Sequence, residues 1–369
     1  MTRDPLYRAV AVQATAAEDS IHLVAPGTGE EIILRGTARR IWERLEYPAT
    51  VNDVAAWLSA EFDGPEALIA EAVAGTVAEL SGRGLVAEHA AAPDPMRDRY
   101  LSLLKSALGN LLYAELELQI QHLEGGAGGL SGADLHRYQR DIAAREPERL
   151  EALLAAKLHG VGPLRYAHTM IGHFRLSNIE RCAEQVIADA IPGDFLEAGV
   201  CKGGAAIFMR ALQVAHGAGE RRTWLVDSFA GVPPSDAPAD SRYDVHLEEG
   251  RRPWLACSQE QVREHFRRYG LLDPNVRFLP GWLADTLPSA ETGPLAILRL
   301  DVDLYSSTAE CLDLLYDRVS PGGFVIVDDY GHYRCCRDAV DDFRRRRRVE
   351  APILWVDESC VYWRKAGPA

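Results

Sequence analysis

Short apolar runs alternate with helical patterns along the second half of the chain. The runs lie at residues 195–198, 224–226, 276–279, 296–300 and 324–327. Between them, apolar residues recur at the spacing of an amphipathic helix. Because strands that alternate with helices form a parallel sheet covered on both faces, we predict a doubly wound, Rossmann-like α/β fold. Two further runs, 353–356 and 361–363, predict an antiparallel hairpin at the sheet edge.

The first 90 residues show a different pattern. Short β-rich runs lie at 9–13, 21–25 and 31–34, and Pro26-Gly27-Thr28-Gly29 forms a turn between the last two. Three helical patterns follow, and Thr37, Thr50 and Pro65 are residue types that commonly begin helices. This order predicts a small α+β domain of the winged-helix type.

The best domain boundary is the segment Ala90-Ala91-Ala92-Pro93-Asp94-Pro95, which is small, contains prolines and lacks periodicity. The next hundred residues are mainly helical in pattern, with a Gly-rich stretch at 125–132. The predicted organisation is therefore a domain at 1–90, a linker at 91–96, a helical extension at 97–190 and an α/β core at 191–369.

The charge of the chain argues against one class of function. Its 369 residues include 40 Lys and Arg and 54 Asp and Glu, a formal net charge of −14. A protein that binds nucleic acid irrespective of sequence needs a basic surface. The one basic run, Arg344 to Arg348, follows Asp338, Asp341 and Asp342 on a predicted helix, and pairing between them accounts for it. We therefore expect no nucleic-acid partner.

The seven cysteines indicate the compartment. None lies in the first 181 residues and no pair has the spacing of a zinc site, so reduced thiols in a cytoplasmic protein are predicted. No run approaches the roughly 18–20 apolar residues of a membrane helix, and the first residues lack the apolar core of a signal peptide. We expect no membrane partner.

A glycine-rich turn follows the first strand of the predicted α/β core. The sequence from 195 to 204 is Phe-Leu-Glu-Ala-Gly-Val-Cys-Lys-Gly-Gly, and such a turn faces the ligand crevice of a doubly wound sheet. Gly199 and Gly203 would let the backbone approach a ligand closely, although tight packing alone also explains them. The spacing is not G-x-G-x-x-G, which disfavours a pyrophosphate. Glu197 would attract an ammonium group and Asp227, ending the second strand, would bind ribose hydroxyls, so S-adenosylmethionine suits the turn better than NAD.

Four carboxylates follow the fourth and fifth strands of the core. Asp301 and Asp303 come directly after one strand, and Asp328 and Asp329 after the next. Neighbouring parallel strands lie about 4.8 Å apart, so these side chains should converge. Such repulsion is relieved by a hard divalent cation, and oxygen ligands favour Mg²⁺. We predict Asp301, Asp328 and Asp329 as ligands and Asp303 as general base, while a helix-capping role for some of them stays open.

With these motifs in hand, residues 97–365 resemble the macrocin O-methyltransferase (TylF-like) family. The likeness rests on the sequences at 100–105, 167–172, 197–204, 226–233 and 281–288, on the aspartates at 301 and 303, and on Val-Asp-Asp-Tyr-Gly at 327–331. The resemblance implies a class I methyltransferase that uses S-adenosylmethionine and Mg²⁺, typically on sugar hydroxyls of natural products.

Carried over residue by residue, the resemblance supports the same metal ligands and the same base. It assigns cofactor contacts to Glu197, Gly199, Asp227, Ser228, Met170 and Trp282. The family's usual glycine and glutamate are replaced here by Val302 and Ser306. The region 235–250 matches poorly, so the usual sugar acceptor is in doubt, and His246 in that region is an alternative base.

The first 90 residues resemble PqqD-like domains, which bind leader peptides during ribosomal peptide maturation. The likeness rests on the hairpin, on Ile41 and Trp42, and on the run beginning at Thr50. A leader would add a strand along residues 30–34, beside the helix at 66–80. We therefore predict a homo-oligomeric O-methyltransferase, specifically a dimer, that acts on a docked precursor peptide. The alternatives are methylation of a sugar hydroxyl on a small natural product and a non-catalytic peptide scaffold.

Overall fold

The computed structural model divides the chain into two compact units. It describes residues 7–9, 13–17, 20–25, 28–45, 51–59, 66–88, 94–124, 146–160, 166–233, 238–240 and 255–367. The N-terminal unit comprises residues 1–98 and 353–358, and the C-terminal unit comprises 99–352 and 359–369. Within the described ranges, no helix is long and apolar enough to cross a membrane.

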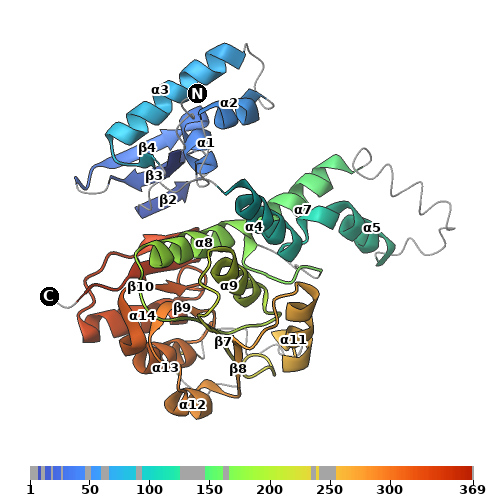
Figure 1. The fold of residues 1–369 in the computed structure, drawn as a ribbon, viewed down its shortest axis with the longest axis vertical. Coiled ribbons are helices and arrows are strands. Elements are labelled where there is room, and N and C mark those ends of the chain that lie inside the picture. The colour runs from blue at the N-terminus through green and yellow to red at the C-terminus, as the bar shows by residue number, and fades with distance from the viewer. Residues whose placement is uncertain are drawn as a thin grey trace. The chain divides into compact units, whose positions relative to one another are not determined.

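The N-terminal unit contains a small antiparallel sheet and three helices (Figure 1). Strands β2 (Gln13–Ala17), β3 (Ser20–Val24) and β4 (Glu31–Arg35) pair in that order, and β1 (Tyr7–Ala9) pairs with β5 (Val86–Glu88). The helices are α1 (Gly36–Arg44), α2 (Val51–Ser59) and α3 (Glu66–Gly82). The core is formed by buried residues that include Leu23, Ile32, Leu34, Ile41, Leu45, Val54, Leu58, Val73, Val77 and Leu80.

The β3–β4 pairing confirms the predicted hairpin. Of the predicted first strand at 9–13, the structure describes only Ala9, which ends β1, and Gln13, which begins β2; residues 10–12 lie outside the described residues. The sequence of β2, Gln-Ala-Thr-Ala-Ala, has low intrinsic strand propensity. Pairing with β3, in the register Gln13↔Val24, makes it a strand.

Helices precede the large sheet. They are α4 (Pro95–Leu108), the short 3-10 helix η1 (Leu111–Tyr113), α5 (Ala114–Glu124), α7 (Pro147–His159) and α8 (Gly172–Ala188). Two fully buried lysines tie them together, since Lys105 Nζ lies 2.6 Å from Glu180 Oε2 and Lys157 Nζ lies 2.6 Å from Glu117 Oε2. The Gly-rich stretch at 125–132 lies outside the described residues.

The sheet of the α/β core has seven strands in the order β11-β12-β10-β9-β6-β7-β8. These are β6 (Asp194–Ala198), β7 (Thr223–Asp227), β8 (Val276–Pro280), β9 (Leu295–Leu300), β10 (Val319–Val327), β11 (Leu354–Trp355) and β12 (Val361–Arg364). Strands β10, β9, β6, β7 and β8 run parallel, and β12 is antiparallel to β10. This confirms the predicted doubly wound sheet.

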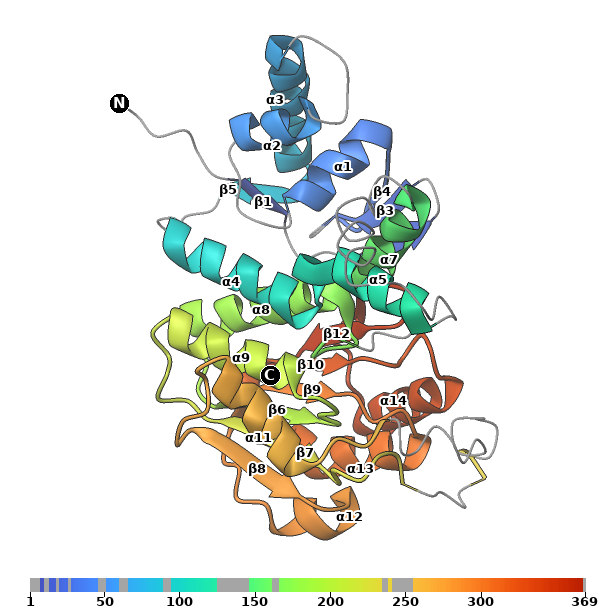
Figure 2. The same ribbon diagram turned by 90° about the vertical axis from the view of Figure 1, so that its right-hand side faces the viewer.

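Helices cover both faces of this sheet (Figure 2). On one face lie α8, α9 (Gly204–Ala215) and α11 (Gln259–Arg268). On the other lie α12 (Leu283–Thr286), α13 (Tyr305–Leu315) and α14 (Arg334–Arg347), with the 3-10 turns η3 (Leu287–Ser289) and η4 (Tyr316–Arg318) in the connections. Every residue of β9 is buried, as expected of a strand covered from both sides.

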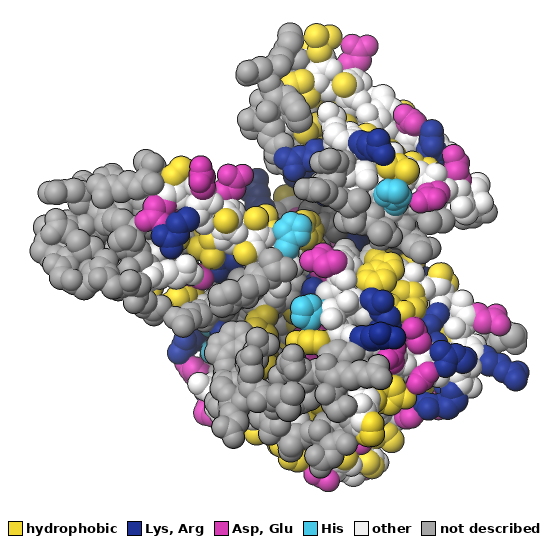
Figure 3. Space-filling view, turned by 180° about the vertical axis from the view of Figure 1, so that it is seen from behind, with side chains coloured by type: hydrophobic (Ala, Val, Ile, Leu, Met, Phe, Trp, Pro, Cys, Tyr) yellow, Lys and Arg dark blue, Asp and Glu magenta, His cyan; other side chains and the backbone are white. Residues whose placement is uncertain are grey.

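Three arginines of the run at the end of α14 form ion pairs. Arg345 forms an ion pair with Asp342 on the same helix, whereas Arg346 and Arg347 reach Asp313 and Asp317. Basic and acidic side chains accordingly lie among one another over α14 (Figure 3).

Candidate active site

The carboxyl ends of the five parallel strands bring the predicted site residues to one edge of the sheet. Gly199 follows β6, Asp227 ends β7, Trp282 follows β8, and the two aspartate pairs follow β9 and β10. In an open α/β sheet, ligands bind outside these ends. The topology therefore places residues that are far apart in the sequence around one crevice.

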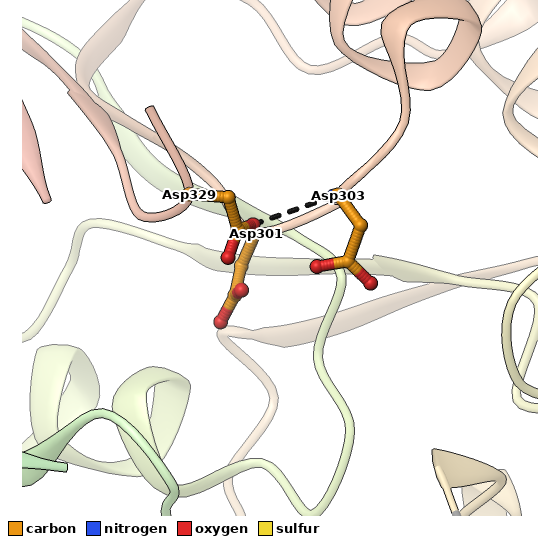
Figure 4. Close-up of side chains that lie close together, drawn as sticks. All are labelled: Asp301, Asp303 and Asp329. Carbon is orange, nitrogen blue, oxygen red and sulfur yellow. Dashed lines mark hydrogen bonds between the residues drawn. The ribbon is translucent and has the colours of Figure 1, made fainter. Parts of the chain in front are cut away.

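Three of the four aspartates form a compact cluster. Carboxylate oxygens of Asp301, Asp303 and Asp329 lie within 4.8 Å of one another (Figure 4). The backbone N–H of Asp303 donates to Asp329 Oδ2 at 3.3 Å. Burial and the neighbouring carboxylates raise the pKa of Asp303 to about 7 and the pKa of Asp301 to about 6, and they raise the pKa of Asp329 well above its ordinary value. Such mutual repulsion is what a bound cation would remove.

The fourth aspartate, Asp328, faces two buried arginines instead. Its Oδ2 accepts from Arg175 Nη1 at 2.5 Å, and its Oδ1 accepts from Arg299 Nη2. Burial alone would raise the pKa of Asp328, but the two guanidinium groups hold it below its ordinary value. The cluster in the structure thus consists of Asp301, Asp303 and Asp329. The ligands predicted from the sequence included Asp328 in place of Asp303. The role of Asp328 as a ligand stays a prediction.

Glu197, the predicted partner of the cofactor's ammonium group, is 1% exposed on β6. Its Oε1 accepts from Arg299 Nη1 at 2.5 Å, while its Oε2 has no hydrogen-bond partner among the described residues. Burial raises the pKa of Glu197 to about 8 in spite of the guanidinium beside it. One oxygen of this carboxylate is therefore used by the fold, and the other is buried without a hydrogen-bond partner among the described residues.

Sequence analysis did not identify Arg175 and Arg299 as part of the site. Arg299 is 1% exposed and donates to Glu197, to Asp328 and, at 3.0 Å, to Asp301. The available signal was a single charged residue in the otherwise apolar strand Leu-Ala-Ile-Leu-Arg-Leu. A charge in a buried strand requires partners, and here they are the acids of the site.

The glycine-rich turn is tightly packed against the acidic strand. Gly199 has φ +82°, and a Cβ there would lie 1.8 Å from the backbone oxygen of Asp301. Gly203 has φ +87°, and its Cβ would lie 2.7 Å from Val262 Cγ1. Packing within the protein is thus sufficient to require both glycines, whether or not a ligand also approaches them.

Gly199→Ala should destabilise the protein more than the control Gly217→Ala. Both glycines have positive φ, +82° and +71°, so alanine at either costs about 1–2 kcal/mol from the left-handed backbone. A Cβ at 217 meets no atom within 4 Å, unlike one at 199. We expect the Gly199 variant to lose about 1–3 kcal/mol beyond the control, measured by urea unfolding. Equal losses would contradict the packing argument.

Asp227 joins the glycine-rich turn to the second strand. Its Oδ2 accepts from the backbone N–H of Val200 at 2.6 Å and of Cys201 at 3.2 Å, and its Oδ1 accepts from Phe229 at 2.7 Å. A carboxylate has about four acceptor positions, so it can still accept from a ligand hydroxyl. Ser228 Oγ donates to the backbone oxygen of Gly231 at 2.9 Å and shapes the same turn.

A hydrogen bond joins the loop that carries Met170 to the glycine-rich turn. Lys202 Nζ donates to the backbone oxygen of Ala167 at 3.0 Å, and His168 Nδ1 lies 2.7 Å from the Oη of Tyr269, the C-cap residue of α11. Burial, with positive neighbours adding to it, lowers the pKa of His168 to about 4, so the ring is neutral at pH 7. Met170 is half-buried in this loop. The roles of Lys202, His168 and Tyr269 in holding this loop were not predicted from the sequence.

Two other predicted residues have different outcomes. Trp282, which follows β8, is 38% exposed beside the carboxyl ends of the strands. His246 and the rest of 241–254 lie outside the described residues, so the alternative base stays a prediction.

Two family models match the chain. The model described as Macrocin-O-methyltransferase (TylF) matches residues 97–365, and the model described as Coenzyme PQQ synthesis protein D (PqqD) matches residues 21–86. Both resemblances predicted from the sequence are thereby confirmed.

Individual relatives match a large part of the chain. A Streptomyces olivaceus protein, 8-demethyl-8-(2,3-dimethoxy-alpha-L-rhamnosyl)-tetracenomycin-C 4'-O-methyltransferase, is 45% identical over 271 residues, which are 73% of this chain and 93% of that protein. Demethyldecarbamoylnovobiocin O-methyltransferase of Streptomyces niveus is 48% identical over 202 residues, 54% of this chain and 76% of that protein. Among solved structures, the O-methyltransferase NovP matches with a TM-score of 0.60 and 37% identity, covering 73% of this chain and 100% of that one.

Proposed function

Because the chain belongs to the macrocin O-methyltransferase (TylF) family, we propose that it methylates a sugar hydroxyl of a natural product, using S-adenosylmethionine and Mg²⁺. Membership makes it an O-methyltransferase with the fold of the S-adenosylmethionine-dependent enzymes. The observation that favours a sugar acceptor is the 45% identity to a methyltransferase named for a rhamnosyl-tetracenomycin. The sequence alone favours a precursor peptide as the acceptor, whereas the relatives support the alternative, a sugar hydroxyl of a natural product.

The acidic cluster fits a divalent cation. Among the described residues, no Lys or Arg forms an ion pair with Asp303 or Asp329, whereas the arginines neutralise the acids deeper in the site. The donor atoms are carboxylate oxygens, which suit Mg²⁺. Asp301 and Asp329 are common to the predicted ligand set and to the observed cluster, so we assign them to the metal. When bound, the ion would offset the cluster's charge and lower the pKa of a hydroxyl that it contacts.

The remaining residues would bind and orient the two substrates. S-adenosylmethionine supplies an already activated methyl group, so positioning is the main task of the protein. Asp227 would accept from ribose hydroxyls, and the free oxygen of Glu197 would accept from the amino group of the methionine end. Asp303 would take the proton from the acceptor hydroxyl as the methyl group is transferred.

Methyl transfer to matched acceptors tests this function. The full chain, S-adenosylmethionine and Mg²⁺ are incubated with a rhamnosylated aromatic natural product or with its aglycone, and products are followed by mass spectrometry. We expect one added methyl on the sugar of the glycoside, none on the aglycone, and loss of the reaction in EDTA. Methylation of the aglycone, or full activity in EDTA, would contradict the proposal.

A second candidate acceptor is a precursor peptide, favoured by the PqqD match at residues 21–86. The first unit would then hold the peptide while the second methylates it. In that case, deletion of residues 1–90 should abolish methylation of a peptide encoded beside this gene. If the same deletion leaves peptide methylation intact, the docking role fails.

The homodimer expected from the sequence also stays a prediction.

A further inference from the structure

Asp303 lies in a strained turn of the backbone. Its φ is +57°, one of few positive values at non-glycine residues of the described chain. The N–H of Leu304 donates to the oxygen of Val302 at 2.6 Å, which closes a three-residue turn around Asp303. Such conformations cost about 1–3 kcal/mol and persist only where the surroundings hold them.

Two groups bind the backbone of Asp303 directly. Asp329 Oδ2 accepts from its N–H at 3.3 Å, and the thiol of Cys335 donates to its carbonyl oxygen at 3.1 Å. Asp329 follows β10, and Cys335 lies in the first turn of α14 and is 1% exposed. Burial raises the pKa of Cys335 to about 12, so its thiol keeps the proton that it donates.

Asp240 holds the chain just beyond this turn. Its Oδ1 accepts from the N–H of Tyr305 at 2.7 Å, and its Oδ2 accepts from Ser306 Oγ at 2.7 Å. These two residues begin α13, whose N-cap position is Leu304, a residue with no side-chain cap. A carboxylate 65 positions earlier in the chain therefore supplies the cap. Its 0% exposure is tolerated because two donors and the positive end of the helix face it.

We propose that Asp240 and Cys335 are positioning residues that hold the Asp303 turn in its left-handed form and so aim the Asp303 carboxylate at the acceptor hydroxyl. The proposal rests on the function proposed above, in which Asp303 takes that proton. The turn is held from three directions, by the chain after β7, by the end of β10 and by α14. Neither proposed residue needs to touch the acceptor.

Ser306 is part of the same arrangement because its hydroxyl donates to Asp240. A glutamate at this position could not donate and would bring a second negative charge against a buried carboxylate. Ser306→Glu should therefore loosen the turn as Asp240→Ala does, although it leaves Asp240 itself in place.

Asp240→Ala in the full chain is the main test, with Asp94→Ala as its matched control. Asp94 Oδ1 also accepts backbone N–H groups at a helix start, from Met96 and Arg97, both at 3.1 Å, but on α4. We expect Asp240→Ala to lower kcat at least about tenfold, because misplacing a reacting group by about 1 Å can cost on the order of a hundredfold. The Kd for S-adenosylhomocysteine, measured by calorimetry, should stay within about twofold, since the cofactor residues are not moved.

Hydrogen exchange gives a readout that needs no turnover. Amides of 301–308 should exchange faster in Asp240→Ala than in the wild type, while those of 223–228 stay unchanged. Unchanged kcat, a parallel loss of S-adenosylhomocysteine binding, or the same kcat loss in Asp94→Ala would each overturn the proposal. If the wild type methylates no sugar acceptor, the proposed function fails. The positioning role of Asp240 is then still tested by hydrogen exchange, because it requires faster exchange at 301–308 in Asp240→Ala.

Cys335 supplies a test by conservative rescue. Cys335→Ala removes the donor to the Asp303 oxygen, whereas Cys335→Ser keeps one. We expect the alanine variant to lose kcat several-fold with unchanged S-adenosylhomocysteine affinity, and the serine variant to recover most of it. Equal kcat in the two variants would show that the thiol only fills space.

Discussion

Asp303→Asn should lower the rate of methyl transfer by about 10²–10⁴-fold, the usual contribution of a general base. Asparagine is the least disruptive replacement at this position, because it tolerates the left-handed backbone better than other residues. The φ of +57° is therefore retained, and the loss reports the missing carboxylate. Rates are measured with saturating S-adenosylmethionine and Mg²⁺. Asp338→Asn, an exposed acid on α14, is the control and should keep full activity.

The same variant should be more stable than the wild type when both are free of metal. Burial and nearby acids raise the pKa of Asp303 to about 7, above the value of about 3.9 in an unfolded chain. The folded protein thus binds more protons between these values, and ionisation of Asp303 destabilises it as pH rises through them. The gain from asparagine should be near zero at pH 4 and on the order of 2 kcal/mol at pH 8.

Unfolding by urea in EDTA at several pH values measures this gain. A variant that loses stability at pH 8, or gains as much at pH 4, would contradict the repulsion between the acids. The rise in Tm on adding Mg²⁺ distinguishes two roles of Asp303. If Asp303→Asn still shows this rise, the missing carboxylate acted as a base; if the rise disappears, the carboxylate was a metal ligand.

Arg299→Ala should destabilise the protein by about 3–5 kcal/mol, as expected when one partner of a buried ion pair is removed. Arg299 is 1% exposed and bonds three carboxylates, those of Glu197, Asp301 and Asp328. Without it, these acids remain buried beside one another with less compensation. Urea unfolding at pH 8 measures the loss, and Arg277→Ala, at an exposed arginine of β8, should stay within about 0.5 kcal/mol of the wild type.

The loss of unfolding free energy caused by Arg299→Ala should be smaller at pH 5. At that pH the acids that Arg299 no longer compensates become protonated, which relieves the repulsion among them. A loss that is the same at pH 5 and pH 8 would show that the side chain acts through packing. Activity should fall in the same variant, since Arg299 also fixes one oxygen of Asp301, which lies 3.0 Å from its guanidinium.

Much of the fold could be predicted because its signals are local. The buried strands of the core appear as apolar runs, and their parallel order places Asp227, Asp301 and Asp329 at the same edge. Most of the strand β2 could not be predicted for the opposite reason, since its residues form a strand by pairing with β3. The sequence left open whether packing requires the glycines, and the folded chain answers this by placing the backbone of Asp301 against Gly199.

The α/β class, the family and the edge of the sheet at which the acids gather could all be predicted from the sequence. These follow from periodicity and motifs that extend over a few neighbouring residues. How the acids divide could be seen only in the folded chain, where Arg175 and Arg299 bind Asp328, while Asp303 lies in a left-handed turn just before α13, whose first residues bind Asp240. The physical reason is that a carboxylate's partner is chosen by distance in space, and Arg175 and Asp328 are 153 positions apart in the chain.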